Sequence, residues 1–163
     1  MRAFIVGCGR VGAGIAERLA RAGHDVTVID ISTEAFARLE PDFPGTAVRG
    51  DGTDEDVLRR AGAQGADVFY ALTEGDNRNI LSAQLASESL DVGRVVAKIN
   101  DPVRSEAYTS LGIATLCRTV MLVDALSAYA GLPIEAGIHG VSEATGIHPG
   151  GEHHAAAPAA REA

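Results

Sequence analysis

Short apolar runs alternate along the chain with longer segments that have a helical spacing. The runs are rich in valine, isoleucine and alanine, lack a strict apolar-polar alternation, and lie at 2–6, 25–29, 46–49, 67–72, 94–99 and 113–117. Strands that are covered on both faces have this character. Because helix-like segments separate the runs, the pattern predicts repeated β-α units. We expect an α/β fold: a Rossmann-like, doubly wound, parallel six-stranded sheet with strand order 3-2-1-4-5-6.

The helices between these runs are predicted from their ends and their apolar spacing. Ser32 or Thr33 is a candidate cap for a helix through 39, three acids follow Thr53, and Pro102 suits a first helical turn. Glycines stop the first and last helices, at Gly23 and Gly131. The remaining predicted helices and the apolar positions expected to face inward are 10–22 (Val11, Ile15, Leu19, Ala22), the segment after the acids (Val57, Leu58, Ala61), 76–90 (Ile80, Leu81, Gln84, Leu85), 102–111, and 119–130 (Val120, Val123, Leu126, Ala130).

The composition changes after residue 131. Residues 132–163 hold three of the six prolines and four of the five histidines, with repeated glycine. The far half, from about residue 148, has too little apolar content to offset the entropy of ordering, so we expect it to be disordered. The predicted organisation is a Rossmann-type domain over 1–131 and a C-terminal extension over 132–163, without a second domain.

Charge and composition exclude several classes of protein. The net charge is −8, from 14 basic and 22 acidic residues, and no block of Lys or Arg stands out. This argues against a nucleic-acid or anionic-membrane binder, which needs concentrated positive charge. No apolar run approaches the roughly 18 residues of a membrane span. The two cysteines, Cys8 and Cys117, fit no metal-ligand spacing, so a reducing cytoplasm is the simpler expectation.

Three glycines follow the first run in the order Gly-x-Gly-x-x-Gly. Gly7 allows a tight turn, Gly9 lets backbone approach a pyrophosphate, and Gly12 lets the helix pack close to the sheet. The helix N-terminus then offers free amides and partial positive charge to phosphates. Asp30 ends the second strand, where its carboxylate accepts hydrogen bonds from ribose hydroxyls. The context therefore favours a dinucleotide or adenine nucleotide site over a mere strand-to-helix turn that needs small residues.

Neighbouring residues refine this prediction. Asp30 repels a 2′-phosphate and residues 31–33 supply no arginine, so NADP is disfavoured. Two interpretations of Arg10 stay open, a bidentate phosphate contact or a solvent-exposed first-turn residue. Cys8 is expected to be a small filler inside the turn and not a nucleophile, because no nearby His or Lys in sequence would activate it.

Polar residues follow three other strands at the edge where ligands bind in open α/β sheets. Asp51 either meets an adenine amino group or starts an acidic helix cap. Residues 73–77 are polar and flexible, on the expected nicotinamide or terminal-phosphate side. Lys98 ends an otherwise apolar strand, which favours a contact with a ligand or a carboxylate.

Three stretches together resemble the RCK/KTN N-terminal (TrkA-N) domain of the cytosolic regulatory subunits of Trk/Ktr-type potassium uptake systems. They are "GCGRVGAGIAERLARAGHDVTVID", "GDGTDEDVLRRAGAQGADVFYALTEGDNRNILSAQLA" and "RVVAKINDPVRSEAYTSLGIATLCRTVMLVDAL". The similarity covers about residues 1–131. The glycine loop alone is unspecific, but its combination with the other two stretches is much more specific.

The resemblance implies a gating subunit without catalysis that forms homo-oligomeric rings under a membrane potassium-transport subunit. It further implies that NAD(H) or an adenine nucleotide (ATP, ADP or AMP) occupies the crevice, and that the protein lies in the cytoplasm at the inner face of the cell membrane. The implied binding residues are Gly7, Cys8, Gly9, Arg10, Val11 and Gly12 at the phosphates, Asp30 at the ribose, Asp51 at the adenine, and Thr73, Glu74 and Lys98 beyond them.

The chain also departs from the family pattern. An acid that some relatives place after the sixth strand is about where Val120 stands here, which argues against cation-bridged ATP. Many members continue into a C-terminal ligand-binding domain, so a second RCK-type chain is a candidate partner. The final helix often crosses to a partner in the family, so Leu122, Val123 and Leu126 are either interface or ordinary core.

An oxidoreductase, a free-standing nucleotide sensor and a metal-binding tail are alternatives to this function. An NAD-dependent oxidoreductase needs an acid or base beside the nicotinamide, and in the predicted folded body the only histidine is His24, at the opposite end of the sheet. A free-standing nucleotide sensor needs no partner. A metal site on the tail histidines lacks a Cys or carboxylate framework, so a solvated tail is the better interpretation. Those histidines are His139, His148, His153 and His154.

Overall fold

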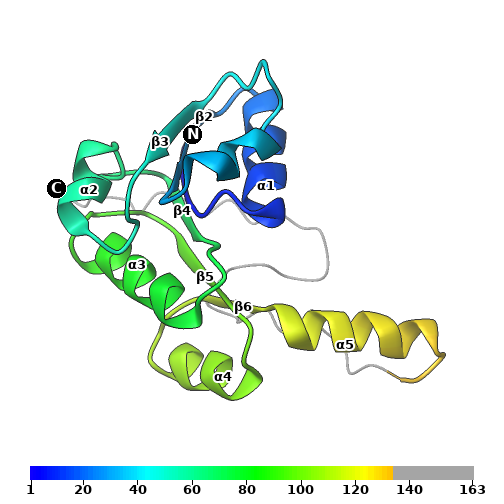
Figure 1. The fold of residues 1–163 in the computed structure, drawn as a ribbon. Coiled ribbons are helices and arrows are strands. Elements are labelled where there is room, and N and C mark those ends of the chain that lie inside the picture. Colours follow the sequence, from blue (N-terminus) through cyan, green and yellow to red (C-terminus); the bar gives the residue numbers. More distant parts are fainter. Residues whose placement is uncertain (134–163) are drawn as a thin grey trace, which may run out of the picture.

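The six strands form one parallel sheet in the order β3-β2-β1-β4-β5-β6, as the sequence pattern predicts (Figure 1). The computed structural model describes residues 1–133. Each predicted apolar run corresponds to one strand; β4, β5 and β6 are shorter than their runs, and β2 extends one residue beyond its run. The strands are β1 (Arg2–Val6), β2 (Asp25–Asp30), β3 (Thr46–Arg49), β4 (Val68–Ala71), β5 (Val95–Ile99) and β6 (Thr115–Cys117).

Helices cover the sheet on both faces. The helices are α1 (Arg10–Arg21), the 3-10 helix η1 (Thr33–Arg38), α2 (Glu55–Arg60), α3 (Asp76–Glu88), α4 (Pro102–Ser110) and α5 (Arg118–Tyr129). Buried residues of α1 and η1 share one core cluster, and those of α2 and α3 share the other. The winding therefore reverses between β1 and β4, which opens a crevice at the carboxyl ends of these strands.

Alternation along the strands builds the two cores. Phe4 and Phe69, which are paired in the register of β1 and β4, stack on the α3 side with ring centroids 5.5 Å apart. Ile5 and Val68 point to the α1 side. All four are buried, so β1 and β4 are fixed from both faces.

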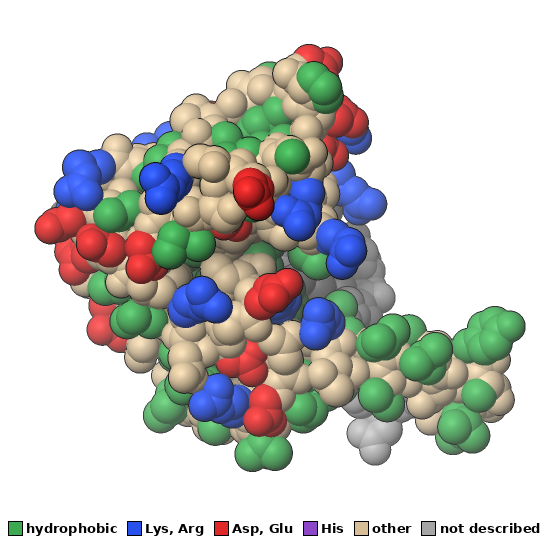
Figure 2. Space-filling model, viewed as in Figure 1, with side chains coloured by type: hydrophobic (Ala, Val, Ile, Leu, Met, Phe, Trp, Pro, Cys, Tyr) green, Lys and Arg blue, Asp and Glu red, His purple; other side chains and the backbone are tan. Residues whose placement is uncertain are grey.

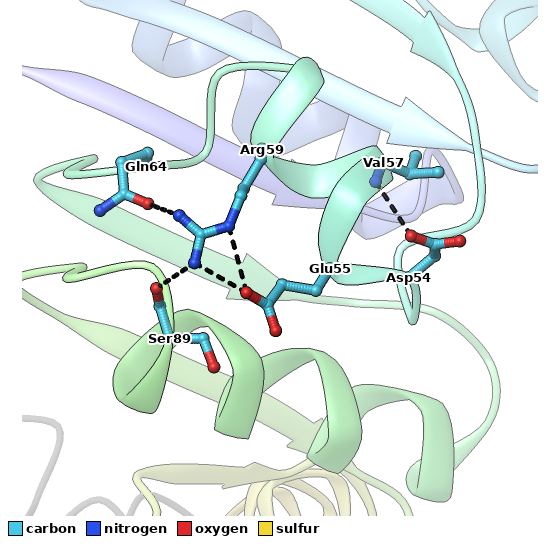
Figure 3. A network of polar contacts seen from close by, with 6 residues as sticks. All are labelled: Asp54, Glu55, Val57, Arg59, Gln64 and Ser89. Atoms are coloured by element: carbon cyan, nitrogen blue, oxygen red, sulfur yellow. Dashed lines mark hydrogen bonds and ion pairs between the residues drawn. The ribbon is translucent and has the colours of Figure 1, made fainter.

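Polar contacts hold α2 in place above the end of α3. Asp54 caps α2 by accepting a hydrogen bond from the Val57 amide. The Arg59 guanidinium pairs with Glu55 and donates to the carbonyl of Ser89 at the end of α3, at 2.8 Å (Figure 3). The short helix thus has a defined start and an anchor on its neighbour.

Three predictions about individual helices were wrong. The segment expected as a helix through 39 is the 3-10 helix η1, with Ser32 at its N-cap position but without a side-chain cap bond. In α1, Val11 is 56% exposed and Ala22 is exposed, because the face against the sheet is made of Gly12, Ala13 and Ala16. In α3, Leu81 is exposed, since Asn79, Ile80, Ser82, Ala83 and Ala86 face inward.

The last helix is not part of the core. No residue of α5 is buried, and Leu122, Val123 and Leu126 are each more than half exposed. Figure 1 shows α5 extending away from the sheet, and Figure 2 shows mostly apolar side chains along it. The interpretation of this stripe as ordinary core is therefore wrong for the chain taken alone. None of the helices within residues 1–133 is long and apolar enough to cross a membrane.

Candidate functional site

A crevice of about 300 Å³ lies where the carboxyl ends of β1, β2, β3 and β4 meet. Figure 2 shows basic and acidic side chains close together over this part of the molecule. The volume is at the lower end of the range for small-molecule sites. Its lining residues are Val6, Gly7, Cys8, Gly9, Ile29, Asp30, Ile31, Ala35, Arg38, Gly50, Asp51, Gly52, Thr53, Leu72, Thr73, Glu74 and Arg78.

The three glycines of the β1–α1 loop differ in what surrounds them. Gly7 has φ +101°, and a Cβ there would lie 2.9 Å from the amide nitrogen of Thr73. A Cβ on Gly12 would lie 1.9 Å from the carbonyl oxygen of Gly7, so the helix packs directly on the loop. A Cβ on Gly9 would meet nothing within 4 Å. Gly7 and Gly12 are thus required by the fold, whereas the space at Gly9 is open to a ligand.

Asp30 ties the loop to the end of β2. Its Oδ2 accepts a hydrogen bond from the Cys8 amide at 2.8 Å, and its Oδ1 accepts one from the Ser32 amide at 2.9 Å. A carboxylate oxygen has capacity for a further donor, so ribose hydroxyls can still bind. Asp30 therefore shapes the loop and remains available to a ligand.

Cys8 is buried beneath this loop and lines the crevice floor. Burial, and then the nearby Asp30 carboxylate, raise the pKa of the Cys8 thiol to about 11. A neutral thiol is a poor nucleophile. The side chain accordingly fills space inside the turn, as its sequence context suggests.

Asp51 lines the crevice from the loop after β3. Its Oδ1 accepts hydrogen bonds from the Thr53 hydroxyl at 2.7 Å and from the Thr53 amide at 2.9 Å. These bonds hold the pKa of the Asp51 carboxyl below its ordinary value. Asp54, and not Asp51, caps α2, so Asp51 is free of the helix-capping role that the sequence left open.

Asn79 fixes the end of β4, and the sequence prediction did not include it. Its Oδ1 accepts hydrogen bonds from the Thr73 amide and the Thr73 hydroxyl, at 2.8 and 2.7 Å. Its Nδ2 donates to the carbonyls of Thr73 and Lys98. Asn79 is fully buried, so one side chain joins β4 to β5 beside the crevice. The motif Asp-Asn-x-Asn contained it, but its role depends on contacts between separate strands.

Asp76, the first residue of α3, bonds the residues that follow β5. Its Oδ1 accepts hydrogen bonds from the amide and the side chain of Asn100, and its Oδ2 accepts one from the Asp101 amide. The Asn100 carbonyl in turn accepts a hydrogen bond from the hydroxyl of Thr119 in the first turn of α5. A chain of polar contacts thus runs from the end of β4 to α5.

Four of the predicted site residues do not line the crevice. Gly12 packs against the loop, and Arg10 and Val11 are exposed at the start of α1. Lys98 is only 9% exposed, on the α1 side of β5. Its burial and the Arg118 guanidinium lower the pKa of the Lys98 ammonium, against the opposing effect of Glu74 and Asp76. The remaining predicted residues, Gly7, Cys8, Gly9, Asp30, Asp51, Thr73 and Glu74, all line the crevice.

Two arginines that the sequence prediction missed do line it. Arg38 reaches it from η1, eight residues after Asp30, and Arg78 reaches it from the first turn of α3. The argument against NADP considered only residues 31–33 as a source of arginine. That argument is incomplete, because Arg38, at the end of η1, lines the same crevice as Asp30.

A second cavity, of about 380 Å³, lies at the opposite end of β4, β5 and β6. Tyr70, Val96 and Leu116 form much of its wall, and Arg94 is the one charged residue in its lining. This cavity is lined mainly by apolar residues and includes no carboxylate from residues 1–133 that could accept hydrogen bonds from a ribose.

Two alternatives to nucleotide binding, a metal site and an oxidoreductase, depend on His, Cys, Asp or Glu side chains. Residues 1–133 hold no group of three or more His, Cys, Asp or Glu side chains that could bind a metal ion. His24 follows α1 and precedes β2, at the end of the sheet away from the crevice. The tail histidines, His139, His148, His153 and His154, lie outside the described residues.

Comparison with known proteins now places this geometry in a family. The family model described as the TrkA-N domain matches residues 3–119. The chain belongs to the TrkA-N domain family. It is 47% identical over 116 residues to the Trk system potassium uptake protein TrkA of Streptomyces coelicolor, a match that covers 71% of this chain and 52% of that protein. The chain spans about half the length of the curated relatives that it matches.

Solved structures share the TrkA-N domain fold. The AMP-bound Kef C-terminal domain of Shewanella denitrificans superposes with a TM-score of 0.68 at 22% identity, covering 80% of this chain and 79% of that one. The GsuK channel bound to NAD superposes with a TM-score of 0.62 at 18% identity, covering 76% of this chain and 22% of that one. At these identities the likeness establishes the Rossmann-like fold.

Proposed function

We propose that this TrkA-N chain is a nucleotide-binding cytosolic regulatory subunit that gates a Trk/Ktr-type potassium uptake channel. NAD(H) or an adenine nucleotide (ATP, ADP or AMP) is the ligand, and no reaction is catalysed. The chain acts as a homo-oligomer or beside a second RCK-type chain. It reaches the inner face of the membrane through the membrane potassium-transport subunit.

The open space at Gly9, in a loop that Asp30 holds through the Cys8 amide, is the observation that carries the nucleotide site. A phosphate placed there meets the start of α1, whose free amides and partial positive charge favour anions. The neighbouring Asp30 carboxylate suits ribose hydroxyls. The AMP and NAD complexes of proteins with the same fold support this choice of ligand.

Two further observations support regulation in an assembly. The curated relatives are named potassium uptake proteins, and this chain corresponds to about half of their length. The α5 side chains Leu122, Val123 and Leu126 are exposed along one helix, which favours burial against another copy of the chain or a related chain. Ligand binding in such an assembly regulates the channel by favouring one arrangement of the chains.

Calorimetric titration with NAD, NADH, ATP, ADP and AMP tests the site. We expect saturable binding of at least one of them and a loss of about tenfold or more with Asp30→Ala, because a charge-assisted hydrogen bond is removed. Asp25→Ala, at the exposed start of the same strand, is the matched control. Absence of binding to all five nucleotides would refute the proposal, as would equal affinities of the two variants.

Potassium flux tests the regulatory part. Vesicles that contain a Trk-type membrane subunit are loaded with this protein and titrated with the nucleotide that binds. We expect nucleotide-dependent flux that Asp30→Ala abolishes. Oxidation of NADH on addition of carbonyl substrates would instead support an oxidoreductase.

A further inference from the structure

The crevice is lined by both acidic and basic side chains. The lining includes three carboxylates, Asp30, Asp51 and Glu74, and two guanidinium groups, Arg38 and Arg78. A nucleotide brings further negative charge into this acidic surrounding. A basic side chain that contacts the phosphates would offset part of this repulsion, in addition to the amides at the start of α1.

Neither of these guanidinium groups is engaged in an ion pair. The ion pairs within residues 1–133 join Arg21 to Glu17 and Glu40, and Arg59 to Glu55. Arg38 donates only a long hydrogen bond, of 3.3 Å, to the Ala35 carbonyl. Both groups thus remain available to an anion.

The backbone of Arg78, in the first turn of α3, is held beside the loop after β3 by the Ser82 side chain. The hydroxyl of Ser82 lies 2.8 Å from the Arg78 carbonyl and 2.7 Å from the Gly52 carbonyl. Ser82 is fully buried, so this link joins the first turn of α3 to the loop after β3. Arg78 therefore starts from a rigid position next to Asp51.

The Arg78 side chain then folds over the loop between β4 and α3. A Cβ built on Gly75 would lie 3.0 Å from Nε of Arg78. The Gly75 amide donates to the hydroxyl of Thr73, and Thr73 is the residue against which Gly7 of the glycine loop packs. This series of contacts places the guanidinium on the same side of the crevice as the predicted phosphate position.

We propose that Arg78 is a specificity-determining residue that contacts the phosphate groups of the ligand and makes the crevice select adenosine ligands by their negative charge. The proposal rests on the proposed nucleotide site. The planar guanidinium binds a phosphate through two parallel hydrogen bonds, which a lysine cannot reproduce. Arg38 also lines the crevice, from η1 after β2, and is unchanged in a variant of Arg78.

Titration of adenosine, AMP and ADP into the wild-type protein and Arg78→Gln tests the proposal. We expect the affinity for adenosine to stay the same and the affinity for ADP to fall about tenfold, as for one charge-assisted contact. Arg60→Gln is the matched control, because it removes the same charge from an exposed position on α2 that does not line the crevice. The loss with Arg78→Gln is expected to shrink at high salt.

The outcomes separate this proposal from the one on which it rests. If the wild-type protein binds none of the three ligands or the other nucleotides, the site itself is wrong. If ADP binds and Arg78→Gln weakens it no more than Arg60→Gln does, only the role of Arg78 is refuted. An equal loss for adenosine and ADP would also overturn it, because Arg78 would then contact the nucleoside.

Discussion

The crevice and α5 show opposite ways of arranging side chains. Around the crevice, several polar groups are engaged by the chain itself: Asp30 accepts a hydrogen bond from the Cys8 amide, and Asn79 accepts one from the Thr73 amide. Along α5, Leu122 and Leu126 are about 60% exposed, and no residue is buried. The polar contacts of the first region form within one chain, whereas the apolar side chains of α5 are not buried by the described residues. In the proposed function, the ligand site and the assembly surface are therefore separate parts of one domain.

The polar contacts from Asn79 to Thr119 connect the two regions. They run through Lys98, Asp76 and Asn100, at the ends of the strands that separate the crevice from α5. A ligand that moves the end of β4 therefore acts on residues in contact with the first turn of α5. The following variants are chosen to break or sharpen the contrast between the two regions.

Gly12→Ala is expected to have the largest effect. The added Cβ would lie 1.9 Å from the backbone carbonyl oxygen of Gly7, so the helix or the loop would have to move to relieve the clash. We expect a loss of about 3 kcal/mol or more in the free energy of unfolding. Urea denaturation followed by circular dichroism measures it.

Gly14→Ala, two residues after Gly12 in α1, is the matched control. A Cβ there meets nothing within 4 Å, so we expect a gain of about 0.5–1 kcal/mol from helix propensity. Similar effects of the two substitutions would contradict the close packing of the helix on the loop.

Asn79→Ala is expected to cost about 2–3 kcal/mol, because buried backbone groups of Thr73 and Lys98 lose their partners. The same urea measurement applies. Asn77→Ala, at an exposed position of α3, is the control and should change little. A loss of less than about 1 kcal/mol for Asn79→Ala would show that other groups take over these hydrogen bonds.

Leu126→Glu is expected to weaken self-association about tenfold or more while leaving the stability of the monomer unchanged, since the side chain is exposed in the single chain. Sedimentation equilibrium of the whole protein measures the dissociation constant. Val103→Glu, on exposed α4, is the control. An oligomer insensitive to Leu126→Glu, or a protein that is monomeric throughout, would refute α5 as the interface.

Lys98→Met has the smallest expected effect, a stabilisation on the order of 1 kcal/mol near neutral pH, because a buried charge is removed. Burial lowers the pKa of Lys98 below the ordinary lysine value of 10.5. At pH values between the lowered pKa of the folded protein and the ordinary pKa of 10.5, the unfolded state binds more protons than the folded state. The stability of the wild-type protein therefore rises with pH in this range. The advantage of Lys98→Met should therefore shrink toward high pH, as thermal denaturation at several pH values can show. A constant advantage would contradict the effect of burial on Lys98.

The sequence predicted the fold well because periodicity and glycine placement are local signals. Six apolar runs predicted the strands and their order, and Gly7, Gly9 and Asp30 predicted one wall of the crevice. The buried face of α1 was predicted only in part: Gly12 was expected to pack close to the sheet, whereas Ala13 and Ala16 were missed, because they pack through their smallness.

Residues that act across the sheet were also missed. Asn79 bonds the carbonyl of Lys98, 19 residues away, and Arg78 is linked to Gly52 only through the Ser82 hydroxyl. The exposure of α5 was equally out of reach, because an apolar stripe looks the same whether the chain itself or a partner covers it. Both cases depend on tertiary geometry that no local pattern contains.

Amide chemical shifts test the central claim most directly. Isotope-labelled protein is titrated with ADP and, separately, with NAD, and each backbone amide is followed to saturation. We expect the largest shifts at residues 7–10, 30–32 and 51–53, with further shifts at 73–75 and 78. Shifts confined to the second cavity, around 93–96 and 112–114, or no saturable shift at either ligand, would show that the loop at Gly9 does not bind phosphate.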